Sequence, residues 1–218
     1  MQTQGITRAV AIAMAPHYSR MSIGAYYKKI EEAQSPIEVA RIERWHLLPG
    51  YLDALADRVT EALQKFPAEV RATVPIIFSA HSLPERILSW NDPYPDELRA
   101  TVTALVERVG PHPHEFAYQS AAISNEPWLG PDVAAALDRL AAEGQRHALV
   151  APIGFVVERA PAQMPRAHDV GIECGGACRY PDRIGGQPEQ RRSFGYDGQV
   201  ILRRAQDARH DQAQPGDD

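Results

Sequence analysis

The amino-acid sequence predicts an α/β fold, specifically a doubly wound parallel sheet. Over the first 155 residues, short and nearly continuous apolar runs alternate with segments in which apolar residues recur every three or four positions. Continuous apolar runs are typical of parallel strands buried on both faces. Their alternation with amphipathic helices favours a parallel sheet that is covered by helices on both sides.

Five segments are expected to form strands. Residues 7–15, 73–80 and 147–155 are apolar runs with the length of a buried strand. Residues 37–45 alternate apolar and charged side chains, and residues 115–119 form a shorter candidate. The first strand, at residues 7–15, is expected to be buried on both faces of the sheet.

Four amphipathic segments separate these strands and are expected to form helices. They lie at residues 26–33, 52–63, 96–109 and 132–143. Pro131 is expected to be the first residue of the last helix, because the first helical position does not need an N–H group. Gly144 is expected to end that helix.

The composition of the chain changes after about residue 156. Arg, Pro, Gly, Gln and Asp dominate there, and the only short apolar stretch after Val157 is residues 200–202. Compact domains rarely contain so long a segment without regular structure. Residues 158–218 are therefore expected to form a disordered or loosely attached tail.

Charge and composition exclude several functions. The chain has 23 Lys and Arg against 28 Asp and Glu, a net charge of −5, which argues against binding to nucleic acid. No apolar run approaches the roughly 18 residues of a membrane span, and no secretory signal is visible at the start. Two cysteines cannot form a disulfide framework, so a cytoplasmic location is expected.

Candidate chemistry lies at two strand ends, where His17 and His81 each follow an apolar run and precede a serine. Ligands bind at the carboxyl ends of strands in doubly wound sheets, and imidazole binds metals or carries protons. Each histidine could instead only form local hydrogen bonds. His81 and Ser82 lack the Gly-x-Ser-x-Gly pattern of serine hydrolases, and no phosphate-binding glycine loop is present.

Other features leave two interpretations open. Cys174 and Cys178 have a spacing that could hold a metal, but the usual second pair of ligands is absent, so two free thiols are the alternative. Residues 92–95 and 128–131 are rigid, apolar segments. They suit either a flat aromatic ligand or simply well-packed turns.

A series of short motifs along the first 155 residues identifies a family. In chain order they are Gly5–Thr7, Ala15–Ser19 with Ser22, Phe78–Pro84, Asn91–Pro95, Tyr118–Ser120, Trp128–Val133 and Pro152–Phe155. Together they closely resemble the ferrochelatases, whose signature is similar to the segments at 78–84 and 91–95.

This resemblance implies the insertion of ferrous iron into a porphyrin, in the last step of haem biosynthesis or the step before it. It implies two Rossmann-like halves around a porphyrin cleft, with His81 binding the metal and accepting pyrrole protons. It also implies that Tyr26 contacts the porphyrin. Neutral imidazole is a suitable ligand for Fe²⁺, and the loss of pyrrole protons requires a base beside the metal. Iron is the substrate, and no resident cofactor is expected.

The sequence departs from the ferrochelatase pattern at both ends. The part of a complete member that precedes the match to Gly5, roughly a third of the chain, has no counterpart here. After Phe155 the family places a glutamate opposite the histidine, whereas this sequence has Pro161 at that point. Glu158 is the candidate substitute. A shifted reading frame near the 3′ end is a hypothesis that resequencing of the coding DNA would test.

The expected organisation is therefore an incomplete first half at residues 1–70, a second half with His81 at residues 71–157, and the divergent tail at residues 158–218. The expected function is that of a ferrochelatase acting on protoporphyrin IX or coproporphyrin III. The alternative is an inactive member that at most binds porphyrin or metal weakly. An incomplete half exposes a sheet edge and apolar faces, so the isolated chain is expected to aggregate.

Overall fold

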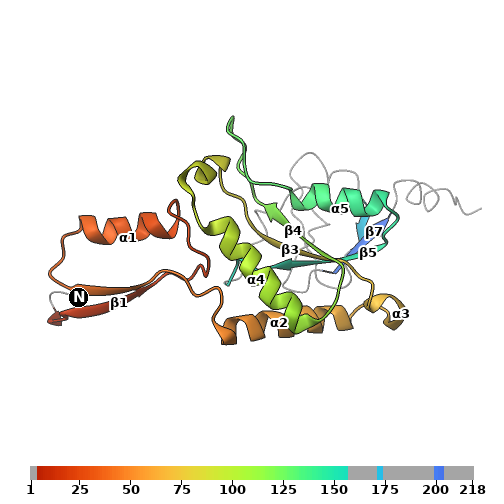
Figure 1. The fold of residues 1–218 in the computed structure, drawn as a ribbon, viewed down its shortest axis with the longest axis horizontal. Coiled ribbons are helices and arrows are strands. Elements are labelled where there is room, and N and C mark those ends of the chain that lie inside the picture. Colours follow the sequence, from red (N-terminus) through yellow and green to blue (C-terminus); the bar gives the residue numbers. More distant parts are fainter. Residues whose placement is uncertain (1–3, 157–170, 174–198, 204–218) are drawn as a thin grey trace, which may run out of the picture.

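Two separate sheets organise the chain in the computed structural model, which describes residues 4–156, 171–173 and 199–203 (Figure 1). In chain order the elements are β1 (Arg8–Ile12), α1 (Ile23–Glu32), β2 (Glu38–Ile42), α2 (Pro49–Gln64), α3 (Ala68–Arg71), β3 (Ile76–His81), the 3₁₀ helix η2 (Glu85–Trp90), α4 (Tyr94–Val109), β4 (His114–Gln119), α5 (Val133–Ala142), β5 (His147–Pro152), β6 (Gly171–Glu173) and β7 (Gln199–Arg203). The strands of the first 155 residues are therefore divided between two sheets.

The smaller sheet consists of β1 and β2, which pair in parallel from Arg8 opposite Glu38 to Ile12 opposite Ile42. Helix α1 packs on one face of this pair. The buried side chain of Tyr27, on α1, donates its hydroxyl to the carbonyl of Ile42 at 2.5 Å. We call β1, α1 and β2 the smaller unit; Figure 1 shows it extending away from the other elements.

The expectation that β1 is buried on both faces is wrong. Val10 is 63% exposed and Ile12 is 55% exposed, while Ala9 and Ala11 are partly buried. The reason is that α1 covers one face of the β1–β2 pair, and no element within the described residues covers the other. The result is an uncovered apolar sheet face, which is uncommon in a soluble monomer.

The larger sheet has the strand order β4-β3-β5-β7-β6. Strands β4, β3 and β5 are parallel, whereas β7 runs antiparallel to β5 and β6 runs antiparallel to β7. The prediction of parallel strands is thus confirmed for the three strands that the first 155 residues contribute to this sheet. The protein has a mixed α/β fold with parallel pairing in both sheets.

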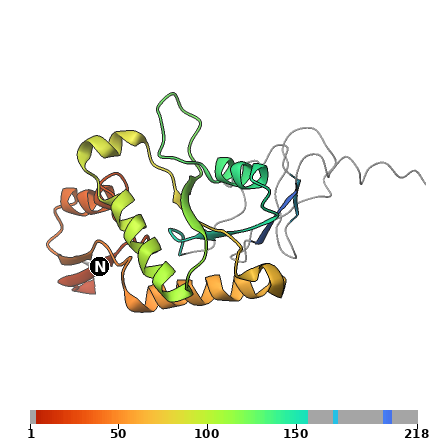
Figure 2. The same cartoon turned by 45° about the vertical axis from the view of Figure 1, so that its right-hand side comes forward.

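Helices cover both faces of the β3–β5 region. On one face, α2 and α4 pack on Phe78, Ala80 and Leu149. On the other, α5 packs on Ile77 and Ala148. Because side chains alternate along a strand, neighbouring residues of β3 enter different cores. Figure 2 shows α2 and α5 on opposite sides of the strands.

Most of the predicted elements are present within a few residues of their expected ends. The prediction for Pro131 is wrong, because α5 begins at Val133 and Asp132 is its capping residue. The carboxylate of Asp132 accepts the N–H of Ala134 at 2.8 Å, and a side-chain acceptor of this kind stabilises a helix start. Gly144 follows the helix with φ of +89°, as expected for a residue that ends it.

The tail differs from its prediction at two points. Strands β6 and β7 lie between residues 158 and 218, where no regular element was expected. The backbone of β7 pairs with the free edge of β5, from Leu149 opposite Gln199 to His147 opposite Ile201. An open strand edge offers unpaired backbone groups, which explains why an apolar stretch pairs there. The rest of the tail lies outside the described residues.

Candidate functional site

His81 is the last residue of β3, the central one of the three parallel strands. Pairing with β4 continues to His81 opposite Gln119, whereas pairing with β5 ends at Ser79 opposite Pro152. The imidazole is partly buried. Ligands of open α/β sheets bind at this carboxyl edge, so the fold places His81 where a ligand-binding group is expected.

Two buried serines flank His81 and differ in their hydrogen bonding. The hydroxyl of Ser82 donates to the carbonyl of Leu129 at 2.8 Å, and its N–H donates to the carbonyl of Gln119 at 2.7 Å. Ser79 is fully buried, and its hydroxyl has no partner in the described part of the chain. Ser82 therefore fixes the segment after β3, while Ser79 contributes no bond of this kind.

The turn before α4 is well packed. Asp92 and Tyr94 are 5% and 8% exposed, and the N–H of Tyr94 donates to Asp92 Oδ1 at 3.0 Å. The hydroxyl of Tyr94 donates to the carbonyl of His81 at 2.9 Å. Of the two interpretations of residues 92–95, these contacts support the packed turn.

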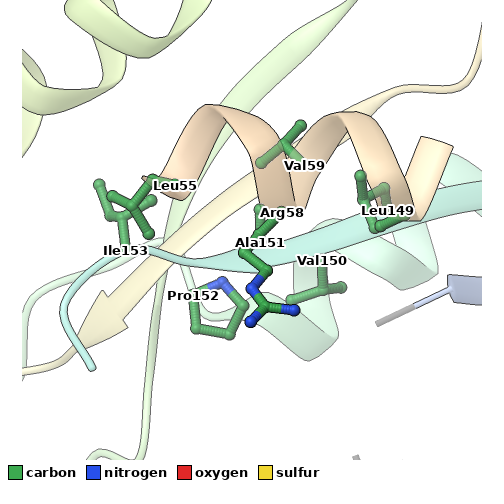
Figure 3. Close-up of a pocket in the computed structure, with 9 residues that line it drawn as sticks. Leu55, Arg58, Val59, Leu149, Val150, Ala151, Pro152 and Ile153 are labelled. Carbon is green, nitrogen blue, oxygen red and sulfur yellow. The ribbon is translucent and has the colours of Figure 1, made fainter. Parts of the chain in front are cut away.

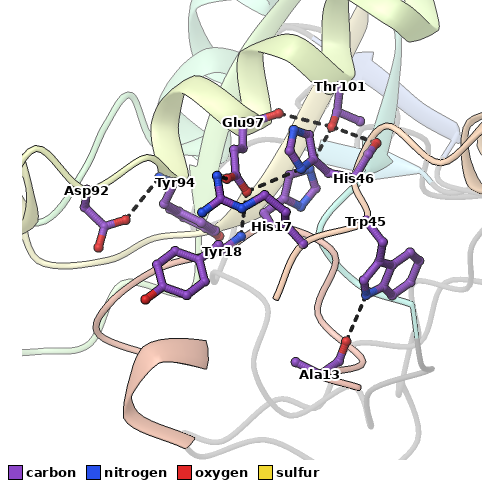
Figure 4. Close-up of polar contacts among 10 residues, drawn as sticks. Ala13, His17, Tyr18, Trp45, His46, Asp92, Tyr94, Glu97 and Thr101 are labelled. Atoms are coloured by element: carbon purple, nitrogen blue, oxygen red, sulfur yellow. Dashed lines mark hydrogen bonds and ion pairs between the residues drawn. The ribbon is translucent and has the colours of Figure 1, made fainter. Parts of the chain in front are cut away.

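His17 is buried and follows β1 of the smaller sheet, whereas His81 ends β3 of the larger sheet. Its Nε2 lies 2.8 Å from the hydroxyl oxygen of Thr101, and its ring stacks on His46 at 5.5 Å (Figure 4). Burial, together with the neighbouring His46, lowers the pKa of His17 from 6.5 to about 3. His17 and His81 both follow apolar runs in the sequence, but the strands that precede them belong to different sheets. The local hydrogen-bonding interpretation holds for His17.

Glu97, on α4, is the acceptor at the centre of this buried cluster. Its Oε2 accepts the N–H of Tyr18 at 2.6 Å and lies 3.3 Å from Nδ1 of His46, while Arg44 lies 3.1 Å from Oε1 (Figure 4). Burial raises the pKa of Glu97, although the Tyr18 N–H and the Arg44 charge act in the opposite direction. The carboxylate thus links α4 to Tyr18, which precedes β2 in the chain, and to Arg44 and His46, which follow it.

The site residues predicted from the sequence did not include His46, Glu97 or Thr101. A signal was present, because Glu97, Thr101 and Leu105 recur at spacings of four on the buried face of α4. Polar residues on a core-facing stripe indicate a buried hydrogen-bonded cluster, since an unpaired polar group is costly there.

Of the remaining predicted site residues, only Tyr26 lies in the described part of the chain. Tyr26 is 65% exposed on α1 and belongs to the smaller unit, whereas His81 belongs to the larger sheet. Glu158, Cys174 and Cys178 lie outside the described residues. In the described part of the chain, no three His, Cys, Asp or Glu side chains are grouped so as to hold a metal ion.

A small apolar pocket lies between α2 and β5 (Figure 3). Leu55 and Val59 line it from α2, and residues 149–153 line it from β5, with Arg58 as its charged residue. Its lining contains neither an imidazole nor a carboxylate, so the pocket lacks the groups that proton transfer or metal binding requires. No helix among the described residues is long and apolar enough to cross a membrane.

Fold and site together define a class of protein. It is an α/β protein in which parallel strands present an imidazole at their carboxyl edge, next to buried serine hydroxyls and a packed Asp-Pro-Tyr-Pro turn. In open α/β sheets this carboxyl edge is where ligands bind.

The chain belongs to the ferrochelatase family, whose model matches residues 1–161. It is 42% identical over 177 residues to a ferrochelatase of Herpetosiphon aurantiacus, covering 79% of this chain and 57% of that protein. It is 35% identical over 196 residues to a coproporphyrin III ferrochelatase of Listeria innocua, covering 87% and 63%. It is also 35% identical over 162 residues to the coproporphyrin III ferrochelatase of Bacillus subtilis, covering 72% and 52%. The chain thus spans between about half and three-fifths of the length of these relatives.

Proposed function

We propose that this chain inserts Fe²⁺ into a porphyrin, with His81 as the residue that binds the metal and accepts a pyrrole proton. The observation that carries the proposal is the position of His81 at the carboxyl end of the central parallel strand, within the segment 78–84 that resembles the ferrochelatase signature. The relatives named ferrochelatase and coproporphyrin III ferrochelatase support a porphyrin as the substrate.

The reaction fixes what the residues must do. The porphyrin loses two pyrrole protons and its four nitrogens bind Fe²⁺, so the products are the iron porphyrin and two protons. Iron keeps its oxidation state, and the proposed reaction therefore requires no redox cofactor. A neutral imidazole suits both tasks, because it is a good ligand for Fe²⁺ and titrates near neutral pH.

Four further proposals accompany this function. Tyr26 contacts the porphyrin, and its 65% exposure on α1 leaves its ring available for such a contact. Glu158 is the second proton acceptor. The chain acts in the cytoplasm.

The chain is organised as two Rossmann-like halves divided near residue 70, in a doubly wound arrangement. Helices on both faces of the β3–β5 region support the doubly wound arrangement. Helix α2 precedes residue 70 in the chain and packs on α4 and β5, which follow it.

The test is an anaerobic chelatase assay with Fe²⁺ or Zn²⁺ and with protoporphyrin IX and coproporphyrin III in turn. The wild-type chain is compared with His81→Ala, and with His114→Ala as the control for loss of an exposed imidazole. Metal insertion by the wild type and the control, but not by His81→Ala, is the expected result. A comparison of the two porphyrins identifies the substrate.

One observation favours a second function, binding without catalysis. The described residues provide His81 with no grouped metal-binding partners. In that case porphyrin fluorescence changes on mixing while no metal is inserted. No insertion and no change in fluorescence would contradict both functions.

A further inference from the structure

Tyr94 connects the backbone of His81 to the start of α4. Its hydroxyl donates to the carbonyl oxygen of His81 at 2.9 Å, and the ring is 8% exposed. Burial raises the pKa of Tyr94 far above its usual value. The phenol is therefore protonated, and available as a donor, at neutral pH.

Tyr94 is itself held by Asp92. The N–H of Tyr94 donates to Asp92 Oδ1 at 3.0 Å. The other oxygen, Oδ2, accepts the hydroxyl of Ser19 at 3.1 Å and the N–H of Arg20 at 2.8 Å. One buried carboxylate thus joins the turn before α4 to the segment that leads into α1.

The end of β3 requires such a support. Beyond Ser79, β3 has a strand neighbour on the β4 side alone, because the pairing with β5 ends at Ser79 opposite Pro152. The Tyr94 hydroxyl reaches the carbonyl of His81 just past this point. A reactive group displaced by about 1 Å can lose on the order of a hundredfold in rate, so an anchor on this carbonyl has chemical consequences.

We infer that Tyr94 is a positioning residue for His81, and that Asp92 fixes Tyr94 relative to the segment before α1. This inference rests on the proposed function, since it assigns Tyr94 a role in metal insertion at His81. Tyr94 does not itself touch the substrate in this role. It holds the strand end from which the imidazole of His81 extends.

The test compares Tyr94→Phe with Tyr27→Phe. Tyr27 is the matched control, because it is also a buried phenol that donates to strand carbonyls, but it lies in the smaller unit. Tyr94→Phe is expected to lower kcat about tenfold with an unchanged KM for the porphyrin, because it removes one hydrogen bond that positions a reacting group. Tyr27→Phe is expected to lose a similar amount of stability with wild-type kcat. Equal kcat values in the two variants would overturn the inference.

A second measurement does not depend on activity. Ser82 directly follows His81, and its N–H donates to the carbonyl of Gln119. The N–H of Leu149 donates to the carbonyl of Pro75, at the other end of the sheet. In Tyr94→Phe, hydrogen exchange of the Ser82 amide is expected to accelerate about tenfold relative to that of Leu149. Unchanged relative exchange would overturn the inference even in an active protein. An inactive wild type with accelerated exchange would contradict the proposed function and leave the anchoring role of Tyr94 supported.

Discussion

Nε2 of His17 lies 2.8 Å from the hydroxyl oxygen of Thr101, a contact between residues 84 positions apart in the chain. It joins the loop after β1 to the middle of α4, and both side chains are buried. Together with Glu97 and His46, these residues form a buried polar cluster between the smaller unit and the larger sheet. The position of one unit on the other therefore depends on polar contacts as well as on apolar packing.

Acid is expected to destabilise the protein through His17. The pKa of this histidine is about 3 in the folded chain and near 6.5 when unfolded, because burial disfavours the imidazolium. Between pH 3 and pH 6.5 the imidazole of His17 is protonated in the unfolded state but not in the folded state. The contribution of His17 to the free energy of unfolding is therefore fully present above pH 6.5 and decreases as the pH falls towards 3. The contribution of His17 to the slope is at most about 1.4 kcal/mol per pH unit. Urea unfolding between pH 4 and 7 measures it. His17→Asn should flatten the slope, with His114→Asn as control, and an equal slope in all three proteins would contradict this assignment.

Glu97→Gln is expected to reduce the free energy of unfolding by about 1–3 kcal/mol at pH 7. The amide keeps an acceptor for the N–H of Tyr18, but it loses the charge that attracts Arg44. Glu107→Gln is the matched control, because Glu107 is an exposed residue of the same helix. Urea unfolding of both variants provides the measurement. A loss below about 0.5 kcal/mol for Glu97→Gln would mean that the charge of this carboxyl contributes little.

The two serines beside His81 are expected to respond differently to alanine. Ser82→Ala should destabilise the chain by about 1 kcal/mol, since it removes the bond to the carbonyl of Leu129. Ser79→Ala should be neutral or stabilising, because the hydroxyl of Ser79 is buried without a partner in the described part of the chain. Thermal melts and urea unfolding compare the variants. A larger loss of stability in Ser79→Ala than in Ser82→Ala would show that Ser79 forms a bond that is not evident here.

The uncovered face of β1 is expected to promote self-association. Val10 and Ile12 are both exposed. They lie on the same face, because residues two positions apart on a strand point to the same side. The double variant Val10→Thr, Ile12→Thr should sediment with a larger monomer fraction than the wild type. Ile123→Thr removes an exposed isoleucine from the loop between β4 and α5 and is the control. A wild type that sediments as a monomer at all concentrations would contradict the expectation.

Much of the fold was predictable from local patterns. The continuous apolar run at residues 73–80 identified β3, and the spacing of apolar residues identified α2 and α4. The motif around His81 indicated both the family and the candidate site. These predictions succeeded because the periodicity of a strand or helix, and the residues of a motif, are properties of neighbouring positions in the chain.

The burial of β1 and the role of His17 were not predictable in this way. An apolar run indicates that a strand is suited to a core, but it does not indicate which element covers each face, and β1 has α1 on one side only among the described residues. His17 and His81 follow similar runs, yet one is an interior neutral residue and the other ends the central strand of the larger sheet.

The sequence by itself determined the order of strands and helices, the ferrochelatase family and the choice of His81 as the candidate site residue. The tertiary structure alone decided that the strands form two sheets, that Asp92 and Glu97 join the units, and that Tyr94 reaches the carbonyl of His81. The physical reason is that these contacts link residues between 13 and 79 positions apart. Such contacts depend on which faces pack together, and local propensity carries no information about that.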